Sequence, residues 1–137
     1  MKTFRKVALV ALVVILASCG KDNKLIGTWV SAGDGSNLNT NVGFVIHETF
    51  KTDGTYEEKF EAQVKVGKEN GNLLMRSIGK WEMNGEDKII IKIDSIVNDH
   101  NYKLPIPSPE ERLIITLDDE TFEYMSGGSK KTRTRKK

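Results

Sequence analysis

The sequence predicts an all-β protein: an eight-stranded antiparallel up-and-down barrel that follows an N-terminal export signal. From Leu25 onward, apolar and polar side chains alternate with period two over several runs. Short turns rich in Gly, Asn and Asp separate these runs, which indicates hairpins between consecutive strands. Closing such a meander removes two exposed sheet edges. A barrel is therefore favoured, with a β-sandwich as the alternative fold.

The N-terminus has the pattern of a secretory signal. Lys2, Arg5 and Lys6 precede an unbroken apolar run from Val7 to Ala17, which small residues follow. The run is about half as long as the roughly 20 residues that a membrane-spanning helix needs. We therefore expect residues 1–18 to be a signal peptide rather than a permanent transmembrane anchor.

The end of this signal resembles the lipobox of bacterial lipoproteins. Leu16-Ala17-Ser18 stands directly before Cys19, the only cysteine in the chain. The resemblance implies a diacylglyceryl group on the Cys19 sulfur, cleavage before that residue and acylation of the new amino terminus. Several acyl chains would make release from a bilayer negligible. Residues 19–24 would then be the lipidated cysteine and a short tether, ahead of a single domain over 25–137.

The residues after the cysteine bear on location. Gly20 is not the Asp that tends to keep such lipoproteins in an inner membrane, so the resemblance favours the outer membrane of the cell envelope. Lys21-Asp22-Asn23 offers one acid, which leaves export to the cell surface open. The periplasmic or surface face is not defined by the sequence.

Charge is unevenly distributed along the chain. The whole sequence of 137 residues carries a formal net charge of +2, which falls to −1 once residues 1–18 are removed. Six of the last eight residues are basic, so the body of the mature protein is acidic. With Cys19 lipidated no thiol remains, which excludes disulfides and cysteine metal ligands.

Eight strands are expected between residues 25 and 136. Their predicted bounds are Leu25–Ser31, Val42–Phe50, Thr55–Val66, Leu73–Met83, Lys88–Ile96, Arg112–Leu117, Thr121–Met125 and Lys131–Lys136. The clearest is Thr55–Val66, where Tyr56, Phe60, Ala62, Val64 and Val66 share one face and charged or amide side chains share the other. Lys88–Ile96 and Arg112–Leu117 repeat the arrangement, with Ile89, Ile91, Ile93, Leu113, Ile115 and Leu117 inward.

The predicted connections are of two kinds. Tight turns are expected at Thr52-Asp53-Gly54, Asn70-Gly71, Asn84-Gly85-Glu86-Asp87 and Leu117-Asp118-Asp119-Glu120. Two longer loops span Ala32–Asn41 and Val97–Glu111, and the second holds His100, Tyr102 and all three prolines. Long loops of barrels usually cluster at a rim, where they would frame a site.

Three short motifs, in order, resemble the small lipocalin-like domains of bacterial lipoproteins. They are Leu25-Ile26-Gly27-Thr28-Trp29, Phe50-Lys51-Thr52-Asp53-Gly54-Thr55-Tyr56 and Gly79-Lys80-Trp81-Glu82. The resemblance implies that Trp29 of the Gly27-x-Trp29 motif closes the barrel floor, with the guanidinium of Arg133 or Arg135 over its ring. Such a contact stabilises by roughly 0.5 to 2 kcal/mol, so the role is structural. The helix that follows the barrel in larger lipocalins is missing, which argues against a large ligand.

A ligand cavity inside the barrel would be mainly apolar. The candidate ligand-binding residues are Phe44, Ile46, Glu48, Tyr56, Phe60, Ala62, Val64, Trp81, Ile91 and Tyr102. Glu48 shares alternation parity with Phe44, Ile46 and Phe50. It is either an inward polar anchor, with Tyr56 or Arg76, or turned to water at a strand end or bulge. Trp29 and Trp81 are interpreted first as core residues.

The sequence carries none of the common catalytic or metal-binding motifs. There is no nucleophile elbow, P-loop, dinucleotide fingerprint or paired cysteine. His47 and His100 fall on different elements without a carboxylate cluster, so no metal or other cofactor is expected. We predict no enzyme. The basic tail alternates with Thr132 and Thr134 as a closing strand would, which favours a solvated strand face or contact with anionic lipid over nucleic acid.

Two functional hypotheses follow from the sequence. The first is a lipid-anchored barrel that binds a small hydrophobic or amphipathic ligand. The second is a filled barrel that serves as a protein-interaction or structural module of the envelope. An eight-stranded barrel is at the limit between a filled interior and room for one small ligand, so the sequence leaves this choice to the structure.

Overall fold

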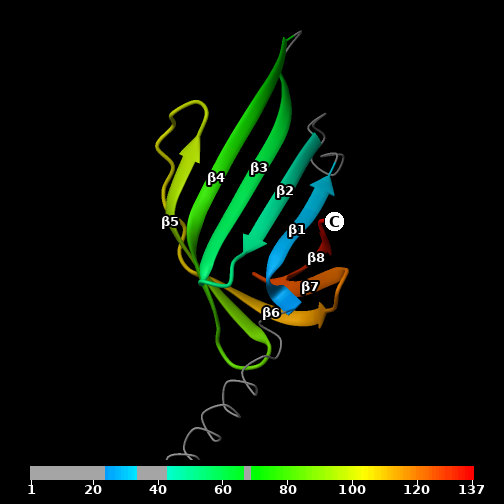
Figure 1. Cartoon of the computed structure of the whole chain (residues 1–137). Helices are drawn as coiled ribbons and strands as arrows, with labels where there is room; N and C mark the ends of the chain where they lie inside the picture. Colours follow the sequence, from blue (N-terminus) through cyan, green and yellow to red (C-terminus); the bar gives the residue numbers. More distant parts are fainter. Residues whose placement is uncertain (1–23, 34–42, 67–68) are drawn as a thin grey trace, which may run out of the picture.

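The computed structural model describes residues 24–33, 43–66 and 69–137, which form one closed antiparallel barrel with the strand order β1-β2-β3-β4-β5-β6-β7-β8 (Figure 1). The strands are β1 (Gly27–Gly33), β2 (Gly43–Phe50), β3 (Thr55–Val66), β4 (Glu69–Met83), β5 (Lys88–Asn98), β6 (Glu110–Leu117), β7 (Thr121–Ser126) and β8 (Ser129–Arg135). The expected up-and-down barrel is confirmed. The expectations for the signal peptide, Cys19 and most of the first long loop lie outside the described residues.

Period-two alternation builds the strands as the sequence predicts. On β3, Tyr56 and Ala62 are buried, whereas Lys59, Glu61 and Gln63 are exposed. The side chains of Val64 and Val66 lie outside the described side chains. On β5, Ile89 and Ile91 are buried and Ile93 packs against the core. One face of each strand therefore lines the barrel and the other faces solvent.

The barrel is closed by short ladders at one end only. β6, β7 and β8 have eight, six and seven residues, against twelve in β3 and fifteen in β4. The β5–β6 ladder runs from Lys88 to Ile91 of β5, and the β1–β8 ladder joins only Trp29 and Val30 to β8. Figure 1 shows β2, β3 and β4 rising well beyond the three short strands. We call this projecting part of β1–β5 the open half, and the part that β6–β8 complete the packed half.

An aromatic core fills the packed half. Its buried members are Leu25, Trp29, Phe50, Tyr56, Trp81, Ile89, Ile91, Phe122 and Tyr124. Phe50 lies at its centre, with ring centroids 5.2 Å from Tyr56, 5.6 Å from Trp81 and 6.2 Å from Phe122, all edge to face. Edge-to-face pairs at such distances add to the stabilisation from burial alone.

The inner face of the open half is apolar but not filled. Register aligns Phe44 with Ala62 and Leu73, and Ile46 with Phe60 and Met75. Five of these six side chains remain partly exposed, and only Ala62 is buried. The next row toward the packed half is polar and holds Glu48, Glu58 and Ser77. The interior therefore changes from aromatic to polar to open and apolar along the strands.

The inward face predicted for β6 is wrong at Leu113 and Ile115. Leu113 and Ile115 are 40% and 48% exposed, while Arg112 is 2% exposed. Leu113-Ile114-Ile115 is a continuous apolar run, so the alternation of apolar and polar residues does not indicate which of its side chains face inward. A register shift between Ile114 and Thr116 then returns Leu117 to the core side. Arg112 takes the inward position because β2 supplies a buried carboxylate for it.

The predicted connections change in two places. Asn70 and Gly71 pair with Lys65 and Val64 inside the β3–β4 ladder, which runs to Val66 and Glu69. The predicted turn at Asn70-Gly71 is therefore wrong, because both residues belong to the ladder. The second long loop is shorter than predicted, because β5 continues to Asn98 and β6 begins at Glu110.

Candidate functional site

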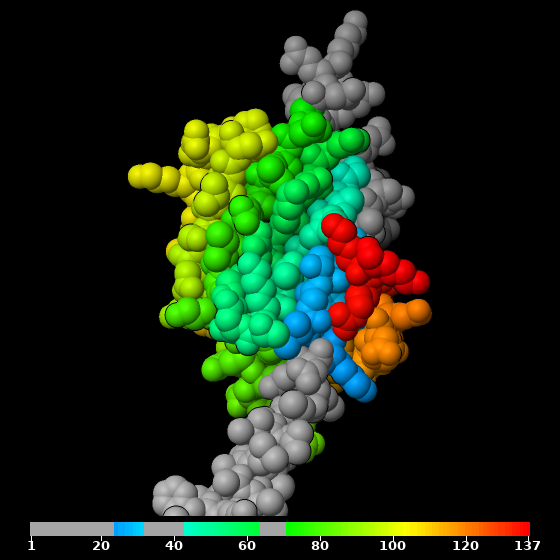
Figure 2. All heavy atoms as spheres, in the orientation of Figure 1, coloured from blue at the N-terminus to red at the C-terminus, as the bar shows by residue number. Residues whose placement is uncertain are grey.

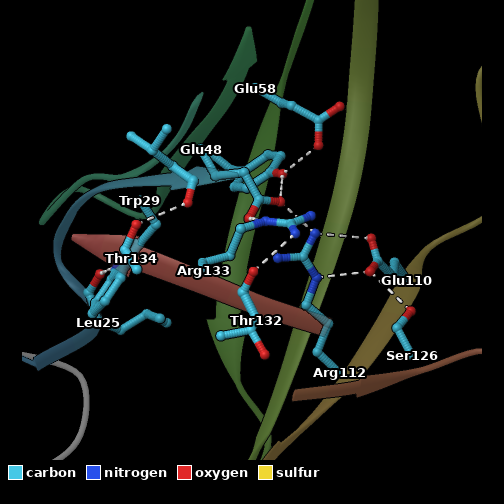
Figure 3. Close-up of polar contacts among 12 residues, drawn as sticks. Leu25, Trp29, Glu48, Glu58, Glu110, Arg112, Ser126, Thr132, Arg133 and Thr134 are labelled. Atoms are coloured by element: carbon cyan, nitrogen blue, oxygen red, sulfur yellow. Dashed lines mark hydrogen bonds and ion pairs between the residues drawn. The ribbon is translucent and has the colours of Figure 1, made fainter. Parts of the chain in front are cut away.

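Glu48 is the centre of a buried polar hub between the two halves of the barrel. Its side chain is fully buried. Its Oε1 accepts hydrogen bonds from Arg112 Nη2 at 2.5 Å and from the Tyr56 hydroxyl at 2.7 Å, and its Oε2 accepts one from Arg133 Nε at 3.1 Å. Figure 3 shows the two guanidinium groups meeting at Glu48. Strands β2, β3, β6 and β8, far apart in sequence, are thereby joined.

A second carboxylate completes the arginine side of the hub. Glu110 Oε1 accepts hydrogen bonds from Arg112 Nε at 2.7 Å and from the Ser126 hydroxyl at 2.9 Å. The Arg112 guanidinium also lies 4.3 Å over the Tyr124 ring. Within the described residues, Arg112 Nη1 and the Tyr124 hydroxyl are buried polar atoms without a hydrogen-bond partner. Such pairs of charged groups are favourable in a protein interior only when both partners are in place.

The pKa values of the hub carboxyls diverge. Burial alone would raise the pKa of Glu48, but the charge and hydrogen bond of Arg112, with Arg133 and Tyr56, lower it to about 2. Burial raises the pKa of Glu58, and the charge of Glu48 raises it further. Burial, followed by the Glu48 charge, raises the pKa of Tyr124 to about 12. Glu48 is therefore the permanent anion of the hub, and Glu58 is the carboxyl that gains a proton more easily.

A cavity of about 600 Å³ lies at the end of β2, β3 and β4 in the open half. Its lining combines the inner-face row of Phe44, Ala62 and Leu73 with residues of the two flanking rows of opposite parity, and Asp99 borders it from the end of β5. Phe44 stacks on Phe60 with ring centroids 6.0 Å apart. Apolar walls with a few polar groups at one end are typical of small-molecule sites.

The floor of the barrel has the geometry that the Gly-x-Trp motif implied, with Arg135 as the arginine. The Arg135 guanidinium carbon lies 4.2 Å over the Trp29 ring, and Trp29 Nε1 donates to the Leu25 carbonyl at 2.8 Å. Arg135 also donates to the carbonyls of Lys24, Ile26 and Asp119. Gly27 has a φ of +128°, and a Cβ there would lie 2.6 Å from Arg135 Nη1. Figure 2 shows the C-terminal residues, in red, against β1, in blue.

The loop between β5 and β6 begins on a buried asparagine. Asn98 Oδ1 accepts from the backbone N–H groups of His100 and Tyr102, and Asn98 Nδ2 donates to the Tyr102 carbonyl at 2.7 Å. The side chains beyond it are exposed, among them Tyr102 at 65% and Ile106 at 55%. The loop, yellow in Figure 2, stands on the outer surface beside β4. Its start is held firmly while its apolar side chains face solvent.

The structure separates the predicted ligand-binding residues by their place in the barrel. Phe44 and Ala62 line the cavity, and Ile46 and Phe60 form the next row. Glu48 points inward and bonds Tyr56, whereas Arg76 lies outside the barrel, 2.6 Å from Glu57. Trp81 and Ile91 belong to the aromatic core, and Tyr102 points to solvent. Val64 falls outside the described side chains. Arg133, the other candidate for the Trp29 ring, bonds Glu48 instead.

Sequence reasoning missed Arg112 and Glu58. Glu58 has the same parity as Tyr56 and Phe60, so the alternation of β3 carried a signal for it. The side chain of Arg112 contradicts its local apolar pattern, and its partner Glu48 is 64 residues away. Only the closed sheet brings those two residues together.

Other features of the described ranges are negative. No group of three or more His, Cys, Asp or Glu side chains in 24–33, 43–66 and 69–137 is placed to hold a metal ion. In the same ranges no helix is long and apolar enough to cross a bilayer. The sequence matches no protein-family model, and no curated protein has significant similarity to it.

Proposed function

We propose that this protein is a lipid-anchored, lipocalin-like barrel of the bacterial cell envelope, attached through Cys19, that binds one small apolar or amphipathic molecule in its open half. A single observation carries the ligand-binding proposal: five large apolar side chains on the inner face of the open half are partly exposed, and two of them, Phe44 and Leu73, line a cavity of about 600 Å³. Burying that surface against a ligand is favourable by about 25 cal/mol per Å².

The polar hub supports a binding role for the open half. It occupies the interior between the aromatic core and the apolar rows, so a ligand would meet a polar layer at the inner end of its site. Pockets of this kind gain orientation from a few placed polar groups. In a barrel filled along its whole length, inner-face residues such as Phe60 and Met75 would be buried, whereas here they are partly exposed.

Ligand binding is tested by native extraction. The mature protein is purified from its own host envelope and denatured, and the extract is analysed by mass spectrometry beside an Ala62→Trp variant. We expect a stoichiometric small molecule with the native protein and its loss in the variant, because the indole fills the cavity at its buried centre. An equal amount of the molecule in both samples, or none in either, contradicts the proposal.

The lipid anchor is tested separately. Cys19→Ala removes the acylated sulfur, so we expect the protein to leave the membrane fraction after cell lysis. A Ser18→Ala variant keeps the cysteine and serves as the matched control. Retention of the Cys19→Ala protein in the membrane fraction contradicts the anchor.

A second candidate function rests on the β5–β6 loop. Tyr102, Leu104 and Ile106 of the loop are exposed at 65%, 40% and 55%, as is Val97 near the end of β5, at 58%. Exposed apolar patches are typical of protein-interaction surfaces. Deletion of Asn101–Ser108 separates the two functions: loss of a cross-linked envelope protein favours an interaction module, and loss of the small molecule favours the loop as part of the ligand site.

A further inference from the structure

Glu58 lies where the polar hub meets the open half. It stands between Tyr56 and Phe60 on the inner face of β3, and register pairs it with Glu48 on β2 and Ser77 on β4. Glu48 is fully buried, but Glu58 is partly exposed. Figure 3 shows Glu58 on the far side of Glu48 from Arg112. Glu58 is therefore the hub carboxyl that a molecule in the open half can reach.

No cation in the described residues pairs with Glu58. The two hub arginines bond Glu48 and Glu110, and the Glu58 carboxyl contacts only the Tyr56 hydroxyl, at 3.1 Å. With every group ionised, the three carboxyls and two guanidiniums of the hub carry a net charge of −1. Glu58 is the hub carboxyl without a cationic partner in the described residues.

Hydrogen bonding at Tyr56 leads to the same conclusion. Its hydroxyl has a single proton but lies 2.7 Å from Glu48 and 3.1 Å from Glu58. The Tyr56 hydroxyl donates to Glu48, whose carboxylate is the closer of the two acceptors and lies at normal O–H···O distance. The carboxyl of Glu58 then lacks a donor whenever it is ionised. A ligand that brings both a proton donor and a positive charge removes both deficits.

A carboxylate head group does not fit the same place. Arg112 is 2% exposed, bonded to two glutamates and stacked on Tyr124, so it presents no face to the open half. Arg133 is 8% exposed and bonded to Glu48. The internal carboxylate of Glu48 thus occupies the position at which an acidic ligand would meet the arginines.

Resting on the proposed ligand-binding function, we propose that the open half takes an amphipathic molecule with a protonated amine head, whose ammonium group pairs with Glu58 while its apolar chain lies along Phe60 and Ala62. Glu58 and Ala62 are four residues apart on β3, a rise of about 13 Å at roughly 3.3 Å per residue. An unbranched chain of about ten to twelve carbons covers that distance. The ligand class is therefore a long-chain amine or a molecule with an equivalent cationic head.

The test compares three probes with the same chain at neutral pH: dodecylamine, dodecanol and dodecanoic acid. The protein is the mature chain, residues 19–137, with Cys19→Ala so that no lipid is attached; binding is measured by calorimetry below the micelle concentration of each probe. We expect dodecylamine to bind at least about ten times more tightly than dodecanoic acid, with dodecanol between them. Glu58→Gln should abolish the preference for the amine and leave dodecanol affinity unchanged.

Two control variants keep the result specific. Glu57→Gln changes the neighbouring carboxyl on the outer face of the same strand and should leave all three affinities unchanged. Ala62→Trp should weaken all three. Equal or tighter binding of dodecanoic acid, or an unchanged amine affinity in Glu58→Gln, overturns the ligand class while dodecanol binding upholds the cavity. If none of the three probes binds, the proposed ligand-binding function itself is overturned.

Discussion

At the scale of single residues, the side chain of Glu48 links β2 to three other strands of the barrel. Its two oxygens hold Tyr56, Arg112 and Arg133, from three different strands. A buried ion pair is weak evidence for net stability, but removal of one partner leaves an uncompensated charge in the interior. Closure of the sheet brings Arg112 and Arg133 to Glu48, and these arginines keep Glu48 ionised. Ionised Glu48 in turn holds β6 and β8 against β2.

Glu48→Gln is predicted to destabilise the fold strongly. The amide keeps the shape of the side chain but removes the anion that pairs with Arg133 and leaves Arg112 with Glu110 alone, a loss of about 3 to 5 kcal/mol. Chemical denaturation measures the difference. Glu57→Gln is the matched control, because Glu57 bonds Arg76 on the outer surface, where an ion pair contributes at most about 1 kcal/mol. Equal effects of the two substitutions would contradict the account of the hub.

The contribution of Glu48 depends on pH with a definite sign. Its folded pKa, about 2, is below the ordinary value of 4.5. The native state therefore binds fewer protons than the unfolded state between these values, and stability is lost as pH falls. We expect the difference in unfolding free energy between wild type and Glu48→Gln to be full above about pH 5 and to shrink toward pH 2. A difference that grows on acidification would contradict the assignment.

At the scale of elements, the β1–β8 closure depends on Arg135 as much as on its two-residue ladder. Arg135 covers Trp29 and donates to three backbone carbonyls. Arg135→Ala is predicted to cost about 1 to 2 kcal/mol and to move Trp29 emission to longer wavelength, because the ring face becomes wet. The measurement uses a Trp81→Phe background, so that Trp29 alone emits. Unchanged emission and stability would show that the arginine does not close the floor.

The β4–β5 bulge requires glycine at position 79. Register shifts between Ile78 and Gly79, and a Cβ at Gly79 would lie 1.9 Å from the Lys92 carbonyl oxygen. Gly79→Ala is predicted to destabilise by about 2 to 3 kcal/mol through this overlap. Gly43→Ala is the control, since a Cβ there meets nothing within 4 Å. Thermal unfolding of both variants decides the point, and a stable Gly79→Ala protein would contradict it.

Sequence alternation predicted elements better than it predicted the site. The bounds of Thr55–Val66 follow from its strict period, and the order of hairpins led to the barrel. The burial of Arg112 could not be predicted from the sequence, because a charged residue is expected to be exposed unless a buried partner is known. Asn70-Gly71 carried a turn signal, but twelve cross-strand pairs of β3 with β4 keep it in the ladder. At Asn70-Gly71 the pairing of two long strands outweighs the local preference of these residues for a turn.

At the scale of the whole molecule, the two halves of the barrel differ in how their interiors are filled. The packed half holds the aromatic core and the floor closed by Arg135, and it carries the fold. The open half extends beyond the three short strands and keeps apolar side chains partly exposed. A filled core tolerates little change in volume, whereas an unfilled one admits a ligand. The central claim is that the open half, and not the packed half, is the binding site.

Methyl NMR with dodecanol as an uncharged probe tests that claim most directly. The protein is the mature chain with Cys19→Ala. We predict saturable chemical-shift changes at Ile46, Leu73 and Met75 of the open half and none at Leu25, Ile89 or Ile91 of the packed half. Leu113 and Ile115 report on unspecific binding at the outer surface. Shifts confined to those two residues, or spread equally over both halves, would contradict a ligand site in the open half.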